Sequence, residues 1–303
     1  MPERTTAGEA MKSIGFVGLG AMGAPMAANL IGKGFALTVH NRTRSREEPL
    51  ASMGAARADS PEEAARGADL VITVVSDTPD VEEVLFGDQG VAKGVESGSV
   101  VIDMSTIDPD AAADFARRFQ KMGVGFLDAP VSGGTEGAAS GTLSIMCGGD
   151  ARTFAQAEPV LSALGATITL VGGPGSGQMT KAINQVIIAG TFLAVAEGIR
   201  LGITAGLDMG AVVKAVRAGS AGSWVLENRS SRMIDGEFPL GFKVSLHRKD
   251  LRIVLAVCER LGIRLRATEM VAQMEDALIE MGQGDEDMSA ISIVAGGVTG
   301  PKG

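Results

Sequence analysis

Ser13-Ile-Gly-Phe-Val-Gly-Leu-Gly-Ala-Met-Gly-Ala-Pro-Met-Ala-Ala-Asn-Leu30 is the stretch that decides the fold of this chain. A short apolar run over residues 14–17 leads into three spaced glycines, and a helical pattern of apolar residues follows. The order strand, tight turn, helix gives each glycine a task. Gly18 permits the sharp turn out of the strand, Gly20 lets the backbone approach a pyrophosphate, and Gly23 lets the helix pack close to the strand.

The glycine pattern predicts a dinucleotide site because it stands between a strand and a helix. Free N–H groups at the helix N-terminus bind the negative charge of a pyrophosphate. The spacing alone is weak evidence, since the chain has 42 glycines and a loop without any ligand would look the same. The strand before it and the helix after it favour a cofactor loop made of Gly18, Leu19, Gly20, Ala21, Met22 and Gly23.

Length and charge restrict the class of protein. The 303 residues, 45% of them hydrophobic, fit one large or two ordinary domains. The net charge of −9 argues against nucleic acid or an anionic membrane as partner. The two cysteines, Cys147 and Cys258, form no zinc motif, so we expect no metal site and free thiols in a reducing compartment. Residues 1–12 lack the apolar core of a signal peptide, which predicts a cytoplasmic protein.

Strand and helix patterns alternate over the first half of the chain, which predicts an α/β fold with a doubly wound parallel sheet. After the first unit, strands are expected over residues 35–40, 70–75, 100–103, 125–128, 143–147 and 166–171, and helices over 62–66, 80–86, 109–122 and 151–164. The glycine-rich break at 172–177 ends this alternation. We predict a dinucleotide-binding domain over 13–174 and an all-helical domain over 175–303.

A long apolar helix is expected over residues 178–205, at the start of the helical domain. Its most apolar stretch, 182–196, is too short and too polar to span a bilayer and is typical of a buried core helix. Because the helix is apolar on nearly every face, it must be covered all round, and a second subunit would help to cover it.

The turn after the second predicted strand indicates which dinucleotide is bound. Asn41 stands where an acidic residue normally accepts hydrogen bonds from the adenosine ribose. An acid would repel a 2′-phosphate, whereas Asn41 does not, and Arg42 offers a planar fork that matches phosphate geometry. With Thr43, this turn favours NADP, and NAD stays possible. The alternative is a solvated basic turn, since Arg44 and Arg46 follow.

Polar segments follow the next two strands, where ligands bind in open α/β sheets. Val75-Ser76 and Ser105-Thr106 lie there, and the Ser76 and Thr106 hydroxyls are placed to bind cofactor ribose or nicotinamide. Ser105 or Thr106 could also cap the helix that begins at Pro109, and both explanations can hold. A further glycine-rich loop holds Ser132, Gly133 and Gly134, which can turn N–H groups toward a small anion, or form a plain turn.

The long helix carries a polar face near its start. Gln178, Lys181, Asn184 and Gln185 share this face by their helical spacing. A lysine at a helix start is usually a solvated surface residue, but these amide neighbours and the apolar surroundings indicate a polar cleft. The helix N-terminus, partial burial and a nearby cationic nicotinamide would lower the pKa of Lys181. Such a lysine can serve as general acid or base near neutral pH.

The segment 242–251 offers two further candidates. His247 has the side chain of a catalytic base, but Lys181 already fills that role and a packed histidine is commoner. Lys249 could reach a phosphate or carboxylate, or form a solvated pair with Asp250.

Taken together, these motifs resemble those of the β-hydroxyacid dehydrogenase family over about residues 14–293. The motifs that carry the resemblance are Gly18-Leu-Gly-Ala-Met-Gly23, Asp103-Met-Ser-Thr106, Asp128-Ala-Pro-Val-Ser-Gly-Gly134, Gly177-Gln-Met-Thr-Lys-Ala-Ile-Asn184, Lys249-Asp-Leu251 and Asp287-Met-Ser-Ala-Ile291. The resemblance implies that Lys181 is the catalytic lysine. It implies a substrate site lined by Ser132, Gly133, Gly134 and Asn184, and a cofactor site that the glycine loop shares with Val75, Ser76, Thr106 and Lys249. It also implies a Rossmann domain joined by a long helix to an all-helical domain, and a homodimer or homotetramer.

The resemblance further implies a reversible hydride transfer between NAD(P) and a short β-hydroxyacid or its semialdehyde. The chain looks like 3-hydroxyisobutyrate dehydrogenases and tartronate semialdehyde (2-hydroxy-3-oxopropionate) reductases, and Asn184-Gln185 is nearer to the reductases. Lys181 argues against imine reductases, and the length argues against 6-phosphogluconate dehydrogenases. A glyoxylate/succinic semialdehyde reductase is one alternative. A non-catalytic NADP-binding module is another, although it would need neither Lys181 nor Asn184.

Overall fold

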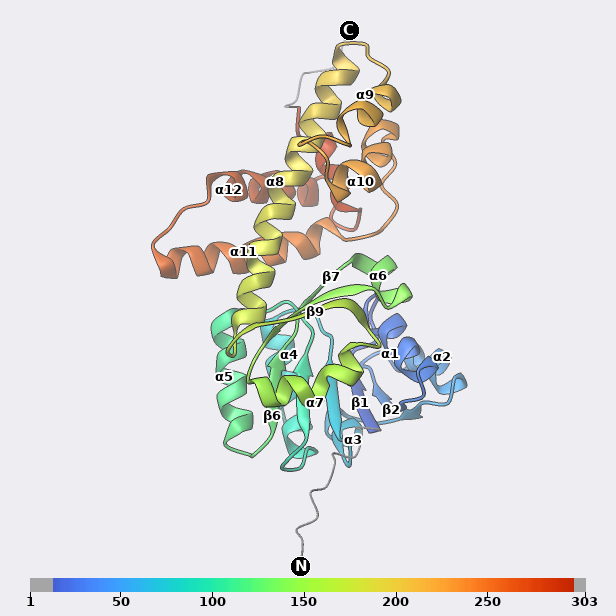
Figure 1. Cartoon of the computed structure of the whole chain (residues 1–303), viewed down its shortest axis with the longest axis vertical. Coiled ribbons are helices and arrows are strands. Elements are labelled where there is room, and N and C mark those ends of the chain that lie inside the picture. Colours follow the sequence, from blue (N-terminus) through green and yellow to red (C-terminus); the bar gives the residue numbers. More distant parts are fainter. Residues whose placement is uncertain (1–12, 297–303) are drawn as a thin grey trace, which may run out of the picture. The chain divides into compact units, whose positions relative to one another are not determined.

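The structure is a computed structural model that describes residues 13–296, coloured along the sequence in Figure 1. The chain divides into two compact units between Lys181 and Ala182. This division falls after residue 174 because hydrogen bonds tie the start of helix α8 (Ser176–Thr204) to the sheet of the first unit. Residues 1–12, over which we predict no signal peptide, lie outside the described part.

Among the described residues, the first unit is built on one nine-stranded sheet. Strands β3, β2, β1, β4, β5 and β6 lie side by side in this order and run parallel. This order is the doubly wound one, and it confirms the predicted α/β fold. The strands are β1 (Ser13–Val17), β2 (Ala36–His40), β3 (Ala56–Arg57), β4 (Leu70–Thr73), β5 (Val100–Asp103) and β6 (Gly125–Asp128).

The sheet edge beyond β6 differs from the expectation that every strand is parallel. Strand β8 (Leu143–Gly148) runs antiparallel to β6 and to β7 (Val131–Ser132), and β9 (Gly165–Gly172) pairs parallel with β8. The chain returns from β7 to β8 through the short helix α6 (Gly134–Ser140), which makes a wide hairpin and not a crossover. A hairpin reverses the strand direction, whereas a crossover preserves it.

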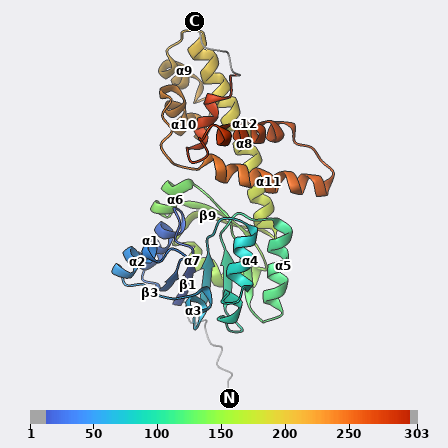
Figure 2. The ribbon, with the colours of Figure 1, turned by 180° about the vertical axis from the view of Figure 1, so that it is seen from behind.

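Alternate residues of the central strands build two separate cores. Ile14, Phe16 and Ile72 belong to one core, and Val17 and Val71 belong to the other. The first core packs against α1 (Gly23–Gly32) and α7 (Ala151–Leu161), and the second against α3 (Pro61–Ala65), α4 (Thr78–Phe86) and α5 (Pro109–Gln120). Figures 1 and 2 show the two faces from opposite sides. Short turns of helix, η1 (Arg44–Glu47), α2 (Glu48–Ser52) and η2 (Val91–Lys93), complete the unit.

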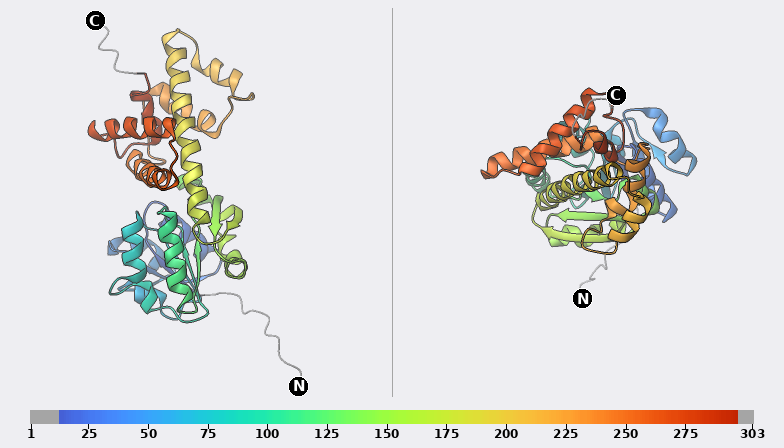
Figure 3. Two further views of the ribbon diagram at one scale, coloured as in Figure 1. Left: turned by 90° about the vertical axis from the view of Figure 1, so that its left-hand side faces the viewer. Right: turned by 90° about the horizontal axis from the view of Figure 1, so that it is seen from above.

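The described part of the second unit is helical, as predicted (Figure 3). One apolar core joins its helices, with Phe192, Leu251 and Val271 among the buried side chains. After α8, the elements are α9 (Met209–Val216), α10 (Trp224–Asp235), α11 (Val244–Leu261), α12 (Arg266–Glu280) and η3 (Met288–Ile293).

Helix α8 exposes more apolar surface than a buried core helix would. Its most apolar window has a mean hydropathy of 1.8 and is 33% buried, and Ile187 and Leu201 are 63% and 72% exposed. By length and composition α8 could cross a membrane, but core helices of globular proteins pass the same test. The single chain therefore covers only part of the helix expected over 182–196, and the rest is the surface for which the sequence predicts cover by a second subunit.

Candidate functional site

The three glycines of the loop between β1 and α1 meet three different surroundings. Gly18 has a φ of +100°, and a Cβ on it would lie 2.2 Å from the Val74 carbonyl oxygen. A Cβ on Gly23 would lie 2.0 Å from the Gly18 carbonyl oxygen, so any side chain would push the helix off the strand. A Cβ on Gly20 would meet no atom of the described chain within 4 Å. The space beside Gly20 is open, as the close approach of a pyrophosphate requires.

The N-terminus of α1 also fits an anionic group. Among the described residues, no side chain caps this helix, and its first turn contains no acidic residue. The first N–H groups of a helix have no acceptor within the helix, and its dipole favours negative charge there. The glycine loop and this helix end are therefore compatible with the pyrophosphate of a dinucleotide.

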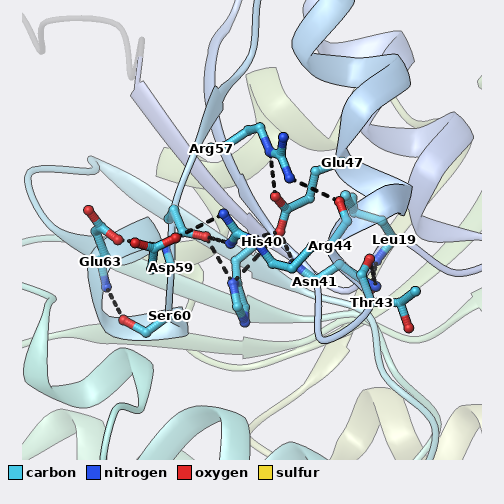
Figure 4. A network of polar contacts seen from close by, with 11 residues as sticks. Leu19, His40, Asn41, Thr43, Arg44, Glu47, Arg57, Asp59, Ser60 and Glu63 are labelled. Atoms are coloured by element: carbon cyan, nitrogen blue, oxygen red, sulfur yellow. Dashed lines mark hydrogen bonds and ion pairs between the residues drawn. The ribbon is translucent and has the colours of Figure 1, made fainter.

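The side chain of Asn41 joins the glycine loop to the turn after β2 (Figure 4). Its Oδ1 accepts a hydrogen bond from the Leu19 N–H at 2.8 Å, and its Nδ2 donates to the Thr43 carbonyl at 2.9 Å. We predicted Asn41 only as a neutral substitute for an acid beside the ribose. Because the amide already bonds to the protein at both ends, its first effect is to shape the cofactor loop.

A buried carboxylate that the sequence did not reveal, Glu47, lies next to this turn (Figure 4). It accepts hydrogen bonds from the Asn41 N–H at 2.9 Å and from Arg57 Nε at 2.8 Å, and it pairs with Arg44 at 3.1 Å. Because Glu47 stands in a run of charged residues, its sequence context predicts a solvated side chain. Only its pairing with Arg57 could have indicated that Glu47 is buried.

The basic residues of the turn have different surroundings. Arg44 binds Glu47, Asp59 at 2.9 Å and the Ala58 carbonyl. Its guanidinium group is therefore occupied by contacts within the protein. Arg42 and Arg46 are exposed, as is Thr43. Of the predicted phosphate ligands, Arg42 is therefore the one with a solvent-facing side chain directly after Asn41.

Hydrogen bonds link the loops that follow β4 and β5. The Ser105 hydroxyl donates to Asp103 Oδ1 at 2.7 Å and accepts from the Val75 N–H at 2.9 Å. The Thr73 hydroxyl donates to the same Asp103 oxygen at 2.7 Å. These bonds place the two loops side by side at the carboxyl edge of the sheet. The predicted cofactor residues in them are Val75, Ser76 and Thr106.

Neither Ser105 nor Thr106 caps helix α5, contrary to the alternative considered for them. The cap is Asp108, whose side chain accepts a hydrogen bond from the Asp110 N–H at 2.8 Å. An acid directly before Pro109 was the better local signal, because aspartate is a strong N-cap and proline suits the first helical position.

Lys181 lies next to the predicted anion-binding turn. It is 7% exposed, and its Nζ donates a hydrogen bond to the Val131 carbonyl at 2.8 Å, one residue before Ser132. Gly133 and Gly134 have φ values of 137° and 62°, which glycine adopts readily. Within the first unit, the structure brings Lys181 together with the Ser132-Gly-Gly turn, and it excludes the solvated lysine of the alternative.

The start of α8 is held at several points. The Asp128 carboxylate accepts hydrogen bonds from the Gly175 and Gln178 N–H groups, each at 2.8 Å. The Gln178 side chain accepts from the Ile107 N–H at 3.0 Å and donates to the Ser105 carbonyl at 2.8 Å. Burial raises the pKa of Asp128 to about 6 against the opposing effect of its two backbone hydrogen bonds. The sequence placed Gln178 on the polar face and Asp128 at the start of a motif, but it gave no sign that the two bond to each other or that Gln178 binds the loop after β5.

The remaining amides of the polar face belong to the second unit. Asn184 Nδ2 donates to Gln185 Oε1 at 2.8 Å, and Gln185 Nε2 donates to Asp250 at 2.5 Å. Lys249 pairs with Asp250 at 2.8 Å. This pair is not solvated, contrary to the alternative, since the side chains are only 15% and 4% exposed.

His247 is a packed residue and not an accessible base. Its ring is fully buried, its Nδ1 lies 2.6 Å from Glu275 Oε1, and its edge faces Phe242. Burial raises the pKa of Glu275, and the nearby His247 opposes this rise. Glu275 was missed because its partner is distant in sequence.

Comparison with known proteins agrees with this geometry. Residues 13–173 match the family model described as the NAD binding domain of 6-phosphogluconate dehydrogenase. Residues 175–294 match the model described as "NAD-binding of NADP-dependent 3-hydroxyisobutyrate dehydrogenase". The chain is 41% identical over 278 residues to 2-hydroxy-3-oxopropionate reductase of Escherichia coli K12, covering 92% of this chain and 95% of that protein.

Solved structures show the same relationship. The chain resembles 3-hydroxyisobutyrate dehydrogenase from Salmonella typhimurium with a TM-score of 0.84 and 30% identity, over 93% of this chain and 99% of that one. It resembles the Mycobacterium tuberculosis 3-hydroxyisobutyrate dehydrogenase solved with L-serine with a TM-score of 0.85 and 30% identity, over 93% and 98%. The chain therefore belongs to the β-hydroxyacid dehydrogenase family of NAD(P)-dependent oxidoreductases that act on hydroxyacids.

Proposed function

We propose that Lys181 is the general acid and base of a reaction that interconverts a short β-hydroxyacid and its semialdehyde. The observation that carries the proposal is the buried Lys181 Nζ, 2.8 Å from the Val131 carbonyl and next to the Ser132-Gly-Gly turn. A buried amine beside a turn that can hold a carboxylate has the position that a proton donor to a bound semialdehyde needs.

The chain's residues divide the work between binding and proton transfer. The nicotinamide cofactor, when bound, supplies or accepts the hydride. Ser132 and the N–H groups of Gly133 and Gly134 hold the substrate carboxylate, and Asn184 orients the reacting oxygen. Lys181 gives a proton to that oxygen during reduction and takes one during oxidation. The hydrogen bond from Lys181 Nζ to the Val131 carbonyl holds the ammonium group beside the Ser132-Gly-Gly turn.

The names of the relatives support a choice of substrate. The reductase from E. coli and the two dehydrogenases act, by their names, on 2-hydroxy-3-oxopropionate and 3-hydroxyisobutyrate. Both are short acids with a β-hydroxyl or β-aldehyde, and the Asn184-Gln185 pair supports the reductase type. We infer that 2-hydroxy-3-oxopropionate is the first substrate to assay.

The cofactor preference proposed is NADP. Asn41 places no negative charge at the end of β2, and the exposed Arg42 next to it can bind a 2′-phosphate. The glycine loop and the N-terminus of α1 would hold the pyrophosphate, and Val75, Ser76 and Thr106 the nicotinamide half. Lys249 is proposed as a further cofactor ligand from the second unit.

We propose that two copies of the chain pair through the apolar face of α8. Within the second unit, a groove of about 620 Å³ runs along this face, lined by Ile187, Thr191, Val213 and Leu226 among others. Apolar residues that border water over a whole helix face favour a second copy as cover. We place the protein in the cytoplasm, which the free thiols of Cys147 and Cys258 support.

Replacement of Lys181 tests the proposed function. Lys181→Ala should lower the turnover of 2-hydroxy-3-oxopropionate by about 10²–10⁴-fold, the range of a lost general acid. NADPH binding, followed by fluorescence, should stay near that of the wild type. Lys181→Arg should not restore turnover, because guanidinium does not release its proton near neutral pH. Lys121→Ala, an exposed lysine of the same unit, is the control. Near wild-type turnover of Lys181→Ala would remove the lysine from the mechanism.

A further inference from the structure

We propose that Gln178 is a positioning residue that fixes Lys181 relative to the loop after β5. The inference rests on the proposed role of Lys181. Gln178 is 1% exposed, and both ends of its amide bind main-chain groups. The oxygen accepts from the Ile107 N–H, and the nitrogen donates to the Ser105 carbonyl. The amide therefore clasps the backbone on both sides of Thr106, a predicted cofactor residue.

The clasp acts on Lys181 through one turn of helix. Lys181 follows Gln178 by three residues on α8, so both side chains lie on the same helix face. The hydrogen bond from Lys181 Nζ to the Val131 carbonyl fixes the far end of the lysine. Gln178 thus fixes the position of this helical turn relative to Thr106, and the Val131 carbonyl fixes the position of the Lys181 ammonium group.

The backbone of Gln178 is held as firmly as its side chain. Its N–H donates to the Asp128 carboxylate at 2.8 Å, which ties the helix to the end of β6. A Cβ on Gly177 would lie 2.4 Å from the Asp128 carbonyl oxygen, so glycine there permits this close approach. Gln178 therefore has one rigid position between the ends of β5 and β6.

The clasped loop belongs to the network of predicted cofactor residues. The Ser105 hydroxyl accepts from the Val75 N–H at 2.9 Å, so a hydrogen bond joins the loops after β4 and β5. Only a neutral side chain of this length that both accepts and donates can satisfy the Ile107 N–H and the Ser105 carbonyl. We infer that glutamine is required here for the distance between proton donor and cofactor.

The first test is Gln178→Met, which keeps the length of the side chain and removes both hydrogen bonds. The kcat for reduction should fall about tenfold to 100-fold, as expected for a misplaced catalytic group. The KM values for NADPH and substrate should change little, because Gln178 is not proposed to touch either. Ser99→Ala is the control, since Ser99 is a buried residue whose hydroxyl donates to the Glu96 carbonyl at the opposite end of β5. It should leave kcat unchanged.

A second readout needs no turnover. Reductive methylation of the protein without cofactor, followed by peptide mass spectrometry, measures how accessible the Lys181 amine is. Gln178→Met should be methylated faster at Lys181 than the wild type, with unchanged rates at exposed lysines such as Lys121. Because this readout does not use catalysis, it distinguishes failure of the clasp from failure of the proposed function, which Lys181→Ala tests.

Gln178→Glu gives the sharpest test, and it also serves if Gln178→Met does not fold. A protonated carboxylic acid accepts and donates as the amide does, whereas a carboxylate can only accept. Burial and the neighbouring Asp128 will raise the pKa of the introduced acid. Its kcat for reduction should therefore recover toward the wild-type value as the pH is lowered. A flat pH profile for Gln178→Glu, or wild-type kcat and methylation for Gln178→Met, would overturn the proposal.

Discussion

His247 Nδ1 and Glu275 Oε1 lie 2.6 Å apart, and both side chains are completely buried between helices α11 and α12. The other nitrogen of His247 and the other oxygen of Glu275 have no hydrogen-bond partner in the described part of the chain. The pair therefore links the two helices at the cost of two unsatisfied polar atoms. Such a pair contributes little net stability, but removing one partner leaves the other buried without a hydrogen-bond partner.

A double-mutant cycle on this pair should show strong coupling. Glu275→Leu or His247→Leu alone should lower the free energy of unfolding by about 3–5 kcal/mol, because each leaves a buried polar group unpaired. The double variant should recover most of this loss. Urea unfolding measures all three proteins, and a double variant as unstable as the sum of the single ones would contradict the coupling. The exposed Arg248–Asp276 pair on the same helices is the control, worth about 1 kcal/mol or less.

Arg42→Ala should discriminate between the two cofactors. A charged contact with a 2′-phosphate is worth about 1.5–3 kcal/mol, so NADPH affinity should fall about tenfold to 150-fold while NADH affinity stays the same. Fluorescence titration of both cofactors measures the difference. Arg44→Ala is the comparison, because Arg44 is bound to Glu47 and its loss should affect both cofactors alike. Equal losses for Arg42→Ala would show that it does not read the phosphate.

Substitutions in the glycine loop should have separate effects on stability and on cofactor affinity. Gly20→Ala should keep the wild-type melting temperature, since its Cβ meets no described atom, yet lose NADPH affinity about tenfold or more where a cofactor must approach. Gly18→Ala should be destabilised by more than about 1 kcal/mol, because alanine resists a positive φ and would clash with Val74. Thermal melts and NADPH titrations test both variants. Unchanged NADPH binding by a folded Gly20→Ala would refute the assignment of this loop.

The free energy of unfolding should depend on pH through the raised pKa of Asp128. Its folded pKa of about 6 exceeds the ordinary value of 3.8, so the folded state holds this proton more tightly than the unfolded state does. The contribution is full below about pH 4 and is lost as the pH rises through about 6, a change of about 3 kcal/mol. Urea unfolding at several pH values should show this decline for the wild type and not for Asp128→Asn. Equal slopes for the two proteins would contradict the raised pKa.

If two copies pair through α8, one substitution in its apolar face should lower the mass of the assembly. Ile187→Asp places a charge in the apolar groove and should convert dimers into monomers at micromolar concentration. Light scattering measures the mass directly. Ile263→Asp, an exposed isoleucine between α11 and α12, should leave the assembly intact. A monomeric wild type would rule out this use of the groove.

The sequence predicted the features that depend on interactions between residues close together in the chain. Strands β5 and β6 lie over the residues expected, because each is a short apolar run bounded by turn residues. The glycine loop was equally visible, since Gly18, Gly20 and Gly23 stand in one short segment between a strand and a helix. The face shared by Gln178 and Lys181 follows from helical spacing alone.

Contacts between distant residues could not be predicted in the same way. Glu47, Asp128 and Glu275 are buried acids whose partners are set by the fold, and each looks like a surface charge in the sequence. The direction of β8 was missed because a strand pattern is the same read either way. The share of α8 that its own chain covers could not be predicted, because an apolar helix has the same composition whether its own chain or another covers it.

The Asn41 amide has a consequence for how cofactor choice can evolve in this protein. The usual single step toward NAD is an acid at the end of β2. Here an aspartate could still accept from the Leu19 N–H, but it would set a carboxylate oxygen against the Thr43 carbonyl, where Asn41 Nδ2 now donates. It would also add negative charge beside the buried Glu47. The single substitution Asn41→Asp should therefore destabilise this turn, and an acid at position 41 needs accompanying changes around Glu47.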